Sequence, residues 1–514
     1  MSVLPSSIPI KPRPSPAYPR LILLALLTLL PTAPLLAQQT APDSEETRRQ
    51  IQSIATQLAQ TQQQLEASQQ QILRLQSELL ALQQRLAYTN PPPVPTPAVP
   101  ASSSATTLAE LEEQQQILAA QVKQHDQTKL ETASKYPVHV TGLILFNTFI
   151  NRGALDQIDL PSIALRSPDG VSSSSIGSSL RQTVLGLKAT GPRLAGAHTS
   201  AEINIDFFGG LPYSNFGTSG GNIRMRTAGV NLDWRNDHIQ LGFTNPLISP
   251  LSPTSYATVG EPALAWAGNL WTWAPQLRYT HSASLPGNHR LILEAGLWDP
   301  PAAGYNSSEL LRVASPGELS AQPTYEGRIA LAGQSEENGF QFGVGGYFGR
   351  QSYSAPFKAI TTYASTLDFR LPLGPHLELT GEGYRGQAIG GLGGGSYKDY
   401  IFGTNPSTGT FTYQPLNAIG GWTQFKARFT QNFEANASIG LDNGFARDFH
   451  AVIQSATAST LQLRARNRMF STNLIYTPKT YLIFSPEYRR VWTWPITGSA
   501  NTLDIFTLSA GYRF

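Results

Sequence analysis

The chain has 514 residues, carries 37 Lys and Arg against 34 Asp and Glu, and contains no cysteine. The lack of cysteine excludes disulfides, thiolate metal sites and cysteine nucleophiles. Only 14% of the residues are charged, and the mean hydropathy is −0.19. Such a value is compatible with a membrane barrel, whose strands alternate apolar and polar side chains. The length suits one large barrel with an appendage better than one ordinary soluble domain.

Residues 1–37 have the features of a secretory signal peptide. Lys11, Arg13 and Arg20 precede the apolar run LILLALLTLLPTAPLLA, and cleavage is expected after Ala37. Removing this segment takes away three basic residues and leaves 34 basic against 34 acidic residues. A neutral mature chain gives no support to nucleic-acid binding.

A heptad repeat over residues 45–88 predicts an α-helical coiled coil. Its a positions hold Ile51, Leu58, Leu65, Ile72, Leu79 and Leu86. A seven-residue repeat without drift favours a left-handed coiled coil over a lone amphipathic helix packed on a globular body. Mixed Ile and Leu at a leave the oligomeric state open. The Pro-rich residues 89–107 are expected to form an extended linker, followed by a short helical segment over 108–135.

From about Tyr136 the hydrophobic period changes to two, which predicts an all-β transmembrane barrel of about sixteen antiparallel strands over 136–514. The connections alternate in length. Turns such as Arg235–Asn236 are short, whereas 245–274 and 387–420 are long. Short turns on one rim and long loops on the other are typical of outer-membrane barrels, and a soluble sandwich has no reason to sort its loops in this way.

The C-terminal stretch LDIFTLSAGYRF, residues 503–514, alternates between an apolar and a polar face. It resembles the C-terminal signal of bacterial outer-membrane proteins, which the barrel assembly machinery reads. We therefore expect Tyr512 and Phe514 to act as the assembly signal. An even number of strands places both barrel ends, and the coiled coil, on the periplasmic side.

Together, the signal peptide, coiled coil, Pro-rich linker, sixteen-stranded barrel and terminal LSAGYRF resemble trimeric outer-membrane porins of the DcaP-like kind. The resemblance covers the architecture of the whole mature chain, but no local motif carries substrate-binding residues over. It implies a homotrimer joined through barrel walls and coiled coil, and passive uptake of small, often anionic solutes.

Polar members of the predicted strands are expected to line the lumen. The charged lining residues expected from this alternation are Arg278, Glu326, Arg328, Asp368, Arg370, Lys426, Arg428, Glu487 and Arg489. Three strands repeat an acid–x–base pair, namely Glu326/Arg328, Asp368/Arg370 and Glu487/Arg489. Such pairs either set up a transverse field that orients dipolar solutes or simply neutralise each other. The signs are nearly balanced, so strong anion selectivity is not indicated, although Lys426 and Arg428 form a local basic spot.

The third outer loop, 245–274, is the best candidate for a constriction inside the barrel. It has a single charged residue, Glu261, and carries Tyr256 and Trp266. A loop that folds inward must be apolar enough to pack against the wall. The alternative is an external loop packed on neighbouring protomers.

Aromatic and basic side chains near the strand ends are assigned to the membrane interface. Trp271 and Trp273 are expected in an aromatic girdle. Arg464, Arg466 and Arg468 share parity with lipid-facing residues, which predicts an outward ladder suited to lipopolysaccharide phosphates or a subunit contact. A β-bulge would instead turn the ladder inward.

The sequence contains no HExxH or Walker A motif, and no catalysis, metal or cofactor is expected. We expect a porin of the bacterial outer membrane that passes small hydrophilic solutes, anions included, through a loop-constricted lumen. The alternative is a structural protein that tethers or spaces the envelope through its coiled coil. The expected partners are outer-membrane lipids, lipopolysaccharide, copies of the same chain, the barrel assembly machinery and, as a further candidate, peptidoglycan.

Overall fold

The computed structural model describes most of the chain from residue 137 to residue 514. Within this range it leaves out 168–172, 212–219, 300–301, 303–312, 334–338, 354–358, 405–407 and 453–463. The expected signal peptide (1–37), coiled coil (45–88), linker (89–107) and short helical segment (108–135) lie outside the described residues and stay predictions. In the described part, no helix is long and apolar enough to span a membrane.

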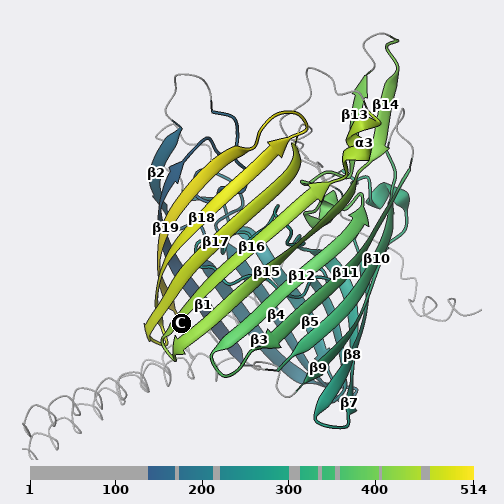
Figure 1. Ribbon diagram of the computed structural model, residues 1–514. Coiled ribbons are helices and arrows are strands. Elements are labelled where there is room, and N and C mark those ends of the chain that lie inside the picture. The colour runs from purple at the N-terminus through teal and green to yellow at the C-terminus, as the bar shows by residue number, and fades with distance from the viewer. Residues whose placement is uncertain are drawn as a thin grey trace, which may run out of the picture. The chain divides into compact units, whose positions relative to one another are not determined.

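Antiparallel strands form one large closed sheet (Figure 1). They are β1 (Val138–Arg152), β2 (Ser174–Ser179), β3 (Val184–Leu194), β4 (Ala197–Asp206), β5 (Arg224–Asp233), β6 (Asp237–Thr244), β7 (Ala274–Leu285), β8 (His289–Trp298), β9 (Thr324–Gly333), β10 (Gln341–Gln351), β11 (Ile360–Pro372), β12 (Leu377–Gln387), β15 (Asn417–Thr430), β16 (Phe433–Gly444), β17 (Arg464–Lys479), β18 (Leu482–Pro495) and β19 (Asn501–Arg513). The smaller elements are η1 (Glu318–Ser320), η2 (Gly390–Leu392), α3 (Ala446–His450) and the hairpin of β13 (Tyr400–Thr404) and β14 (Phe411–Pro415).

The sheet closes on itself and has sixteen strands around its wall. It contains seventeen strands, but β2 and β3 both pair with β1, one above the other, and together make a single wall strand. The last strand, β19, pairs with β1 from Leu143–Arg513 to Arg152–Asp504. Closure satisfies the backbone groups that a free edge would leave unpaired in lipid. The predicted barrel of sixteen antiparallel strands is confirmed.

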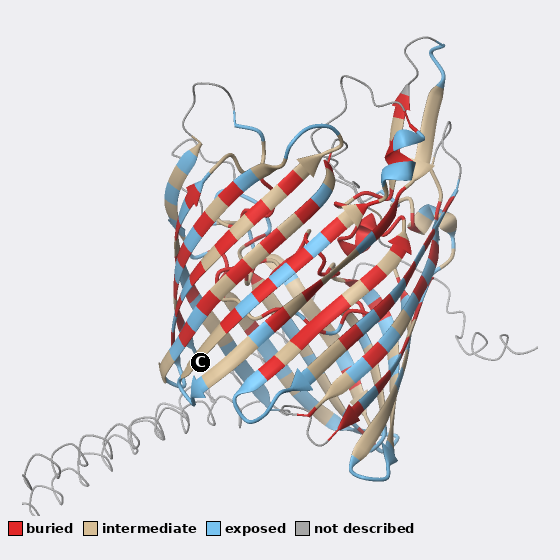
Figure 2. Cartoon of the chain, in the orientation of Figure 1, coloured by how far each residue is buried: buried red, intermediate tan, exposed pale blue. Residues whose placement is uncertain are grey.

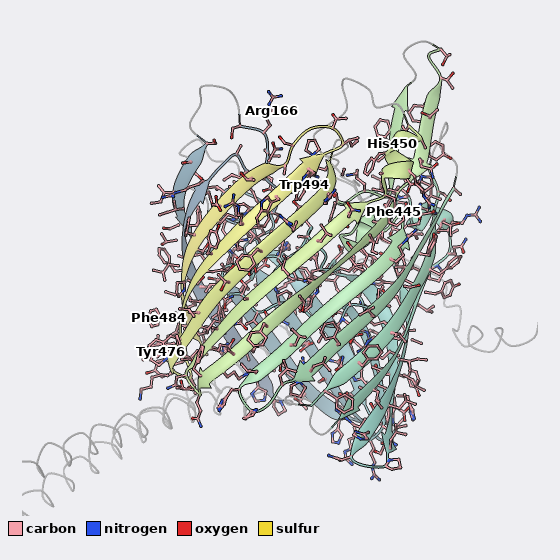
Figure 3. All side chains as sticks on the ribbon, in the orientation of Figure 1. Arg166, Phe445, His450, Tyr476, Phe484 and Trp494 are labelled. Carbon is pink, nitrogen blue, oxygen red and sulfur yellow. The ribbon has the colours of Figure 1, made fainter. Side chains whose placement is uncertain are left out.

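Exposed and buried residues alternate along the wall strands (Figure 2). On β19, Phe506 and Leu508 face outward and are exposed, whereas Leu503, Ile505 and Ser509 are buried inside. This period of two is the pattern of a wall with an apolar lipid side. The outward aromatics Tyr476 and Phe484 lie towards the end of the barrel that holds the C-terminus (Figure 3).

The two ends of the barrel differ in their connections. The turns β3–β4, β5–β6, β7–β8, β11–β12, β15–β16 and β17–β18 are short and lie at the end that holds the C-terminus, here called the short-turn end. The opposite end, called the long-loop end, carries the β13–β14 hairpin and α3 (Figure 1). This sorting agrees with the predicted connections. In outer-membrane barrels short turns face the periplasm and long loops face outward.

The barrel holds an apolar core inside its wall. Leu247, Ile248 and Leu270 of one loop meet Trp298 and Tyr384 of the wall and bury almost all of their surface. Each large side chain removed from water in this way contributes about 1.5–3 kcal/mol to the packed state. The inward loops are therefore packed like a protein interior.

The terminal Phe514 completes the seam between β19 and β1. Its backbone exchanges two hydrogen bonds with Gly142, at 2.9 and 3.0 Å, and its ring lies where a Cβ of Gly142 would be.

We predict that Phe514→Ala lowers the fraction of chain that folds and inserts into liposomes, because the ring no longer covers the seam. Heat-modifiable migration on gels measures this fraction. Leu508→Ala, on the outward face of the same strand, is the control; equal folding of the two variants would contradict the role.

Candidate functional site

The loop between β6 and β7, residues 245–274, lies inside the barrel and is held by wall carboxylates. Glu326 of β9 accepts a hydrogen bond from the Leu247 backbone N–H at 2.8 Å. Glu382 of β12 accepts from Leu251 N at 2.7 Å and from the Ser249 hydroxyl at 2.5 Å. These contacts agree with the expected inward folding. A loop cut off from water needs such acceptors, because an unpaired buried N–H costs about 1–3 kcal/mol.

The same loop continues across the lumen to the opposite wall. The Ser255 hydroxyl donates to Glu487 of β18 at 2.6 Å, and Thr254 N donates to Gln424 of β15 at 2.6 Å. On β17, Asn473 donates to the Thr254 carbonyl at 2.9 Å. The loop therefore spans the barrel rather than resting against one side of it.

Neutral amides that the sequence analysis did not single out also anchor the loop. Gln182 both donates to the Ala257 carbonyl at 3.0 Å and accepts from Gly260 N at 2.8 Å. Asn467 donates to the Trp266 carbonyl at 3.1 Å. An amide can serve a donor and an acceptor together. In the sequence, only the place of these amides on the lumen side of the alternating pattern pointed to such a role.

Glycines allow the loop backbone to approach the wall closely. Gly268 has φ +105°, a conformation that strains other residues, and a Cβ there would lie 2.1 Å from the Gly421 carbonyl oxygen. A Cβ on Gly440 of β16 would lie 2.1 Å from the Ala267 carbonyl oxygen. Both contacts are with backbone atoms, which cannot rotate away.

Two further long loops enter the barrel at the long-loop end. In the loop after β1, Ala164 N donates to Thr493 at 3.0 Å, and the Ser162 carbonyl accepts from Asn467 at 3.0 Å. In the loop after β12, Gly395 N donates to Asp442 at 3.0 Å. The inward folding of these two loops was not expected from the sequence.

The two residues of an acid–x–base pair do not always form an ion pair with each other. Arg328 forms a bidentate ion pair with Asp368 of β11, with N–O distances of 2.7 and 2.8 Å, and also contacts Glu294 at 2.5 Å. Glu326 instead holds the loop. Arg370 lies half-buried on the inward face of β11. The charges are thus paired between strands, and Asp368 is fully buried.

The third pair does form along its strand. Arg489 Nε lies 3.2 Å from Glu487 Oε1, and both residues are buried. Lys426 and Arg428, the expected basic spot, have acidic neighbours. Lys426 lies 3.9 Å from Glu434 and Arg428 lies 3.7 Å from Glu378. These acids offset much of the positive charge of the spot.

The three loop residues expected at the constriction are half-buried inside the barrel. The Tyr256 hydroxyl accepts a hydrogen bond from Arg513 at 2.8 Å. Trp266 stacks on Tyr397 with ring centroids 4.2 Å apart. Glu261 is the charged member. Burial first and the charge of Asp156 second raise the pKa of Glu261 to about 7, against a smaller lowering by Arg224.

An arginine cluster that the sequence analysis missed lies beside this loop. Arg224 forms a bidentate pair with Asp206, with N–O distances of 2.6 and 3.0 Å, and donates to the Gly260 carbonyl at 2.6 Å. Arg226 donates to Val259. The repeat Arg-Met-Arg in β5 was the sequence signal for this cluster, because it places Arg224 and Arg226 on one face of the strand. A β-bulge beside Met225 turns both arginines inward.

The girdle assignment of Trp271 and Trp273 is wrong. Trp271 is 8% exposed, and its backbone N–H donates to the Leu392 carbonyl of an inward loop at 3.1 Å. Trp273 lies under the guanidinium groups of Arg224 and Arg226, at 5.3 and 4.7 Å from its ring centre. Both rings pack inside because the loop that carries them enters the barrel before β7 begins.

The arginine ladder of β17 is divided between the two sides of the wall. Arg466 is exposed and Arg468 half-buried on the outer face, as expected, whereas Arg464 is 5% exposed inside. A register shift between Arg464 and Arg466 accounts for the difference. Arg464 donates to the Ser396 carbonyl at 3.0 Å and lies 5.0 Å from the Trp266 ring centre. The outward prediction is therefore wrong for Arg464.

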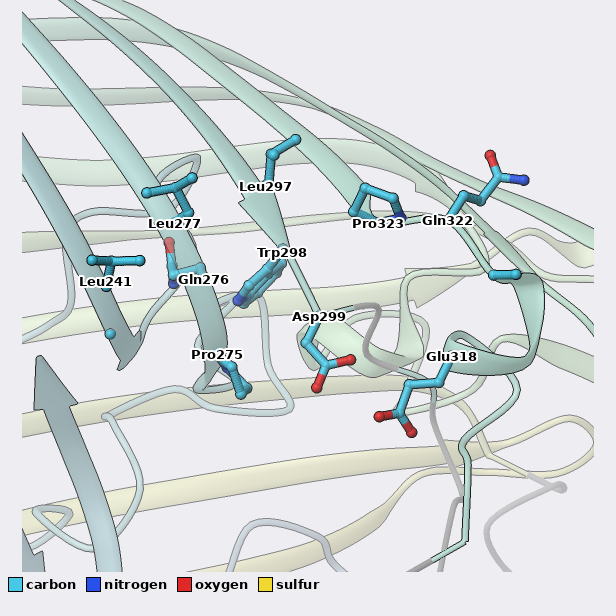
Figure 4. A pocket seen from close by; sticks show the side chains of 12 residues that line it. Leu241, Pro275, Gln276, Leu277, Leu297, Trp298, Asp299, Glu318, Gln322 and Pro323 are labelled. Carbon is cyan, nitrogen blue, oxygen red and sulfur yellow. The ribbon is translucent and has the colours of Figure 1, made fainter. Parts of the chain in front are cut away.

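A groove of about 690 Å³ lies on the outer wall near the long-loop end (Figure 4). It is lined by Leu241, Leu277 and Leu297, which point away from the lumen. Apolar grooves between outward side chains are expected on a wall that faces lipid. The candidate functional site is therefore the loop-filled lumen and not this groove. Among the described residues there is also no group of three or more His, Asp or Glu placed to hold a metal ion.

A closed wall of sixteen antiparallel strands, an outward apolar face and inward-folded loops define the class of sixteen-stranded outer-membrane barrels. Solved structures agree with this class. The outer-membrane channel DcaP of Acinetobacter baumannii is 13% identical, with a TM-score of 0.57, over 74% of this chain and 99% of that one. This likeness shows that the chain has the fold of the DcaP channel.

Two further solved structures are similar at a lower level. An anion-selective porin from Comamonas acidovorans is 11% identical over 74% of this chain and 100% of that one, with a TM-score of 0.45. OprB of Pseudomonas putida is 10% identical over 73% and 94%, with a TM-score of 0.45. No protein-family model matches the sequence, and no curated protein matches it either.

We predict that Gly440→Ala loosens the loop 245–274, because the new methyl group displaces the Ala267 backbone at a cost of about 1–3 kcal/mol. Hydrogen–deuterium exchange of the loop peptides should rise, while the wall strands stay protected. Gly346→Ala is the matched control, since a Cβ at Gly346 meets nothing within 4 Å. Unchanged loop exchange in Gly440→Ala would refute the tight backbone contact.

Docking of the loop is also predicted to depend on pH through Glu261. Its pKa is about 7 in the docked loop against 4.5 in water, so the docked state is favoured below about pH 4.5 and loses this advantage as pH rises through 7. The difference corresponds to about 1–3 kcal/mol. Loop exchange, corrected for intrinsic rates, should increase from pH 5 to pH 8. Glu261→Gln should flatten this dependence; an identical pH profile would contradict it.

Proposed function

We propose that the protein is a porin of the bacterial outer membrane, through which small hydrophilic solutes diffuse passively past the loop 245–274. The observation that carries this proposal is the loop itself, which crosses the lumen and is held by Glu326, Glu382 and Glu487 on three separate strands. A loop fixed across a closed barrel narrows the path and gives it a defined size. The likeness to the DcaP channel supports the same assignment.

The residues expected to line the pore divide into two groups. Glu326, Arg328, Asp368, Glu487 and Arg489 are buried. We assign them to holding the loop and the wall, because their charges are used in short contacts. The remaining lining residues, which keep part of their surface open, are Tyr256, Glu261, Trp266, Arg278, Arg370, Lys426 and Arg428.

Near the short-turn end, the solvent-exposed charges on the inward face are mainly positive. Lys188 and Arg513 are exposed, and the side chain of Arg428 is 38% exposed. The acids Glu202 and Glu434 are more buried, and the half-exposed Asp233 lies 2.5 Å from His238. Because accessible charge sets the local ion concentration in a pore, this distribution favours small anions over cations.

Single-channel recording in planar bilayers tests the proposal. The purified full chain should give discrete conductance steps, and Gly440→Ala should widen them while Gly346→Ala leaves them unchanged. Reversal potentials in a salt gradient should show a preference for anions that Arg428→Gln reduces and the outward Arg350→Gln does not. Absence of conductance steps, together with capture of the protein on intact peptidoglycan, would replace the porin by the envelope tether.

The proposal extends to assembly and location. We propose a homotrimer in the outer membrane, joined through barrel walls and the predicted coiled coil of residues 45–88, with the coil on the periplasmic side. The placement of the short turns supports the periplasmic side, since they face the periplasm in barrels of this class. Tyr512 and Phe514 are proposed as the signal for the barrel assembly machinery.

A further inference from the structure

Four arginines gather on the outer face of the barrel at the long-loop end. Arg466 and Arg468 belong to β17, Arg490 to β18 and Arg152 to β1. They occupy neighbouring positions, because Phe470 pairs with Arg490, Arg490 with Asp504, and Asp504 with Arg152. Among the described residues, Asp504 is the acidic side chain that lies between them, 3.5 Å from Arg490. Four positive charges and one negative charge leave this surface, here called the arginine patch, with a net charge of +3.

Outward aromatic rings hold these arginines in place. Arg468 lies over Trp492 at 4.3 Å, and Arg466 lies over Trp494 at 4.8 Å. Arg490 lies over Trp492 at 5.4 Å. A guanidinium stacked on an indole keeps its plane fixed and its N–H edges free for planar acceptors.

The level of the arginine patch along the wall matches a membrane interface. Trp494 lies near the long-loop rim, and Phe484 lies towards the opposite end of the same strand (Figure 3). Ten positions separate Trp494 from Phe484, which corresponds to about 33 Å along the strand. At a strand tilt of about 35–45° this distance spans about 25 Å of height, which matches the apolar band between two aromatic girdles. Arg466, which pairs with Trp494, therefore lies at the edge of this band, where headgroups are found.

We propose that the arginine patch binds the phosphate groups of an anionic glycolipid in the outer leaflet. Guanidinium groups form bidentate hydrogen bonds with phosphate oxygens, and basic residues beside an interfacial aromatic belt attract anionic headgroups. A patch of net charge +3 complements a headgroup with two phosphates. The site is separate from the lumen, because its side chains have the opposite parity to the buried Glu487 and Arg489.

Native mass spectrometry of the purified full chain in detergent tests this proposal with three probes: diphosphoryl lipid A, monophosphoryl lipid A and inorganic phosphate. The variant is the triple substitution R466Q/R468Q/R490Q. The matched control is Arg350→Gln, which removes an exposed outward arginine near the same end of β10. Heat-modifiable migration on gels establishes that each variant is folded before it is used.

The wild-type chain and Arg350→Gln should retain diphosphoryl lipid A and bind the monophosphoryl form more weakly. The triple variant should lose about tenfold or more in affinity for diphosphoryl lipid A. Equal binding by the triple variant and the wild type would overturn the proposal. So would retention of inorganic phosphate as strong as that of the lipid, or dissociation of oligomers in the triple variant with lipid binding unchanged. The last result would assign the patch to a contact between copies of the chain.

Discussion

Every backbone N–H and C=O of this chain that is removed from water needs a partner, and this constraint determines the structure at two levels. In the wall, β19 pairs with β1 and leaves no free edge. In the lumen, the backbone of the loop 245–274 does not pair with any described wall strand before β7 begins, so wall side chains accept hydrogen bonds from its N–H groups. Glu326, Glu382 and Gln424 perform for the loop what neighbouring strands do for the wall.

This use of the wall acids explains why charged residues are buried in a pore. Hydrogen bonds from the loop offset part of the cost of removing a wall carboxyl group from water. Arg328 and Asp368 neutralise each other across strands and form part of a rigid wall. In the proposed pore, the residues that meet solutes are the more open ones. Under this proposal, charge in the lumen serves either support or selectivity according to its burial.

The sequence predicted the wall better than the contents of the barrel. Alternation located the sixteen wall strands, because lipid demands an apolar residue at every second position. Some strand ends differ from the pattern: the alternation predicts strands over 468–477 and 480–490, whereas β17 begins at Arg464 and β18 continues to Pro495. These ends extend past the apolar band, where polar residues are tolerated on both faces and the pattern fades.

The inward loops could be predicted only in part. The low charge of 245–274 indicated that it folds inward, but the loops after β1 and β12 gave no comparable signal, because their burial depends on wall residues far away in sequence. The partner of Asp368 could not be deduced either. Parity indicates that a side chain faces the lumen, whereas its neighbour depends on the register between strands and on bulges such as those beside Met225 and Arg464.

The close contacts at Gly268 and Gly440 have a consequence for how such a channel tolerates change. The loop is fixed in part through its own backbone, by glycine contacts and by amide groups bound to wall side chains. Its half-buried side chains are therefore freer to vary than the buried Leu247, Ile248 and Leu270. Exchange of residues such as Tyr256 would alter the width and chemistry of the passage on an unchanged support, which makes this barrel a suitable starting point for engineered nanopores.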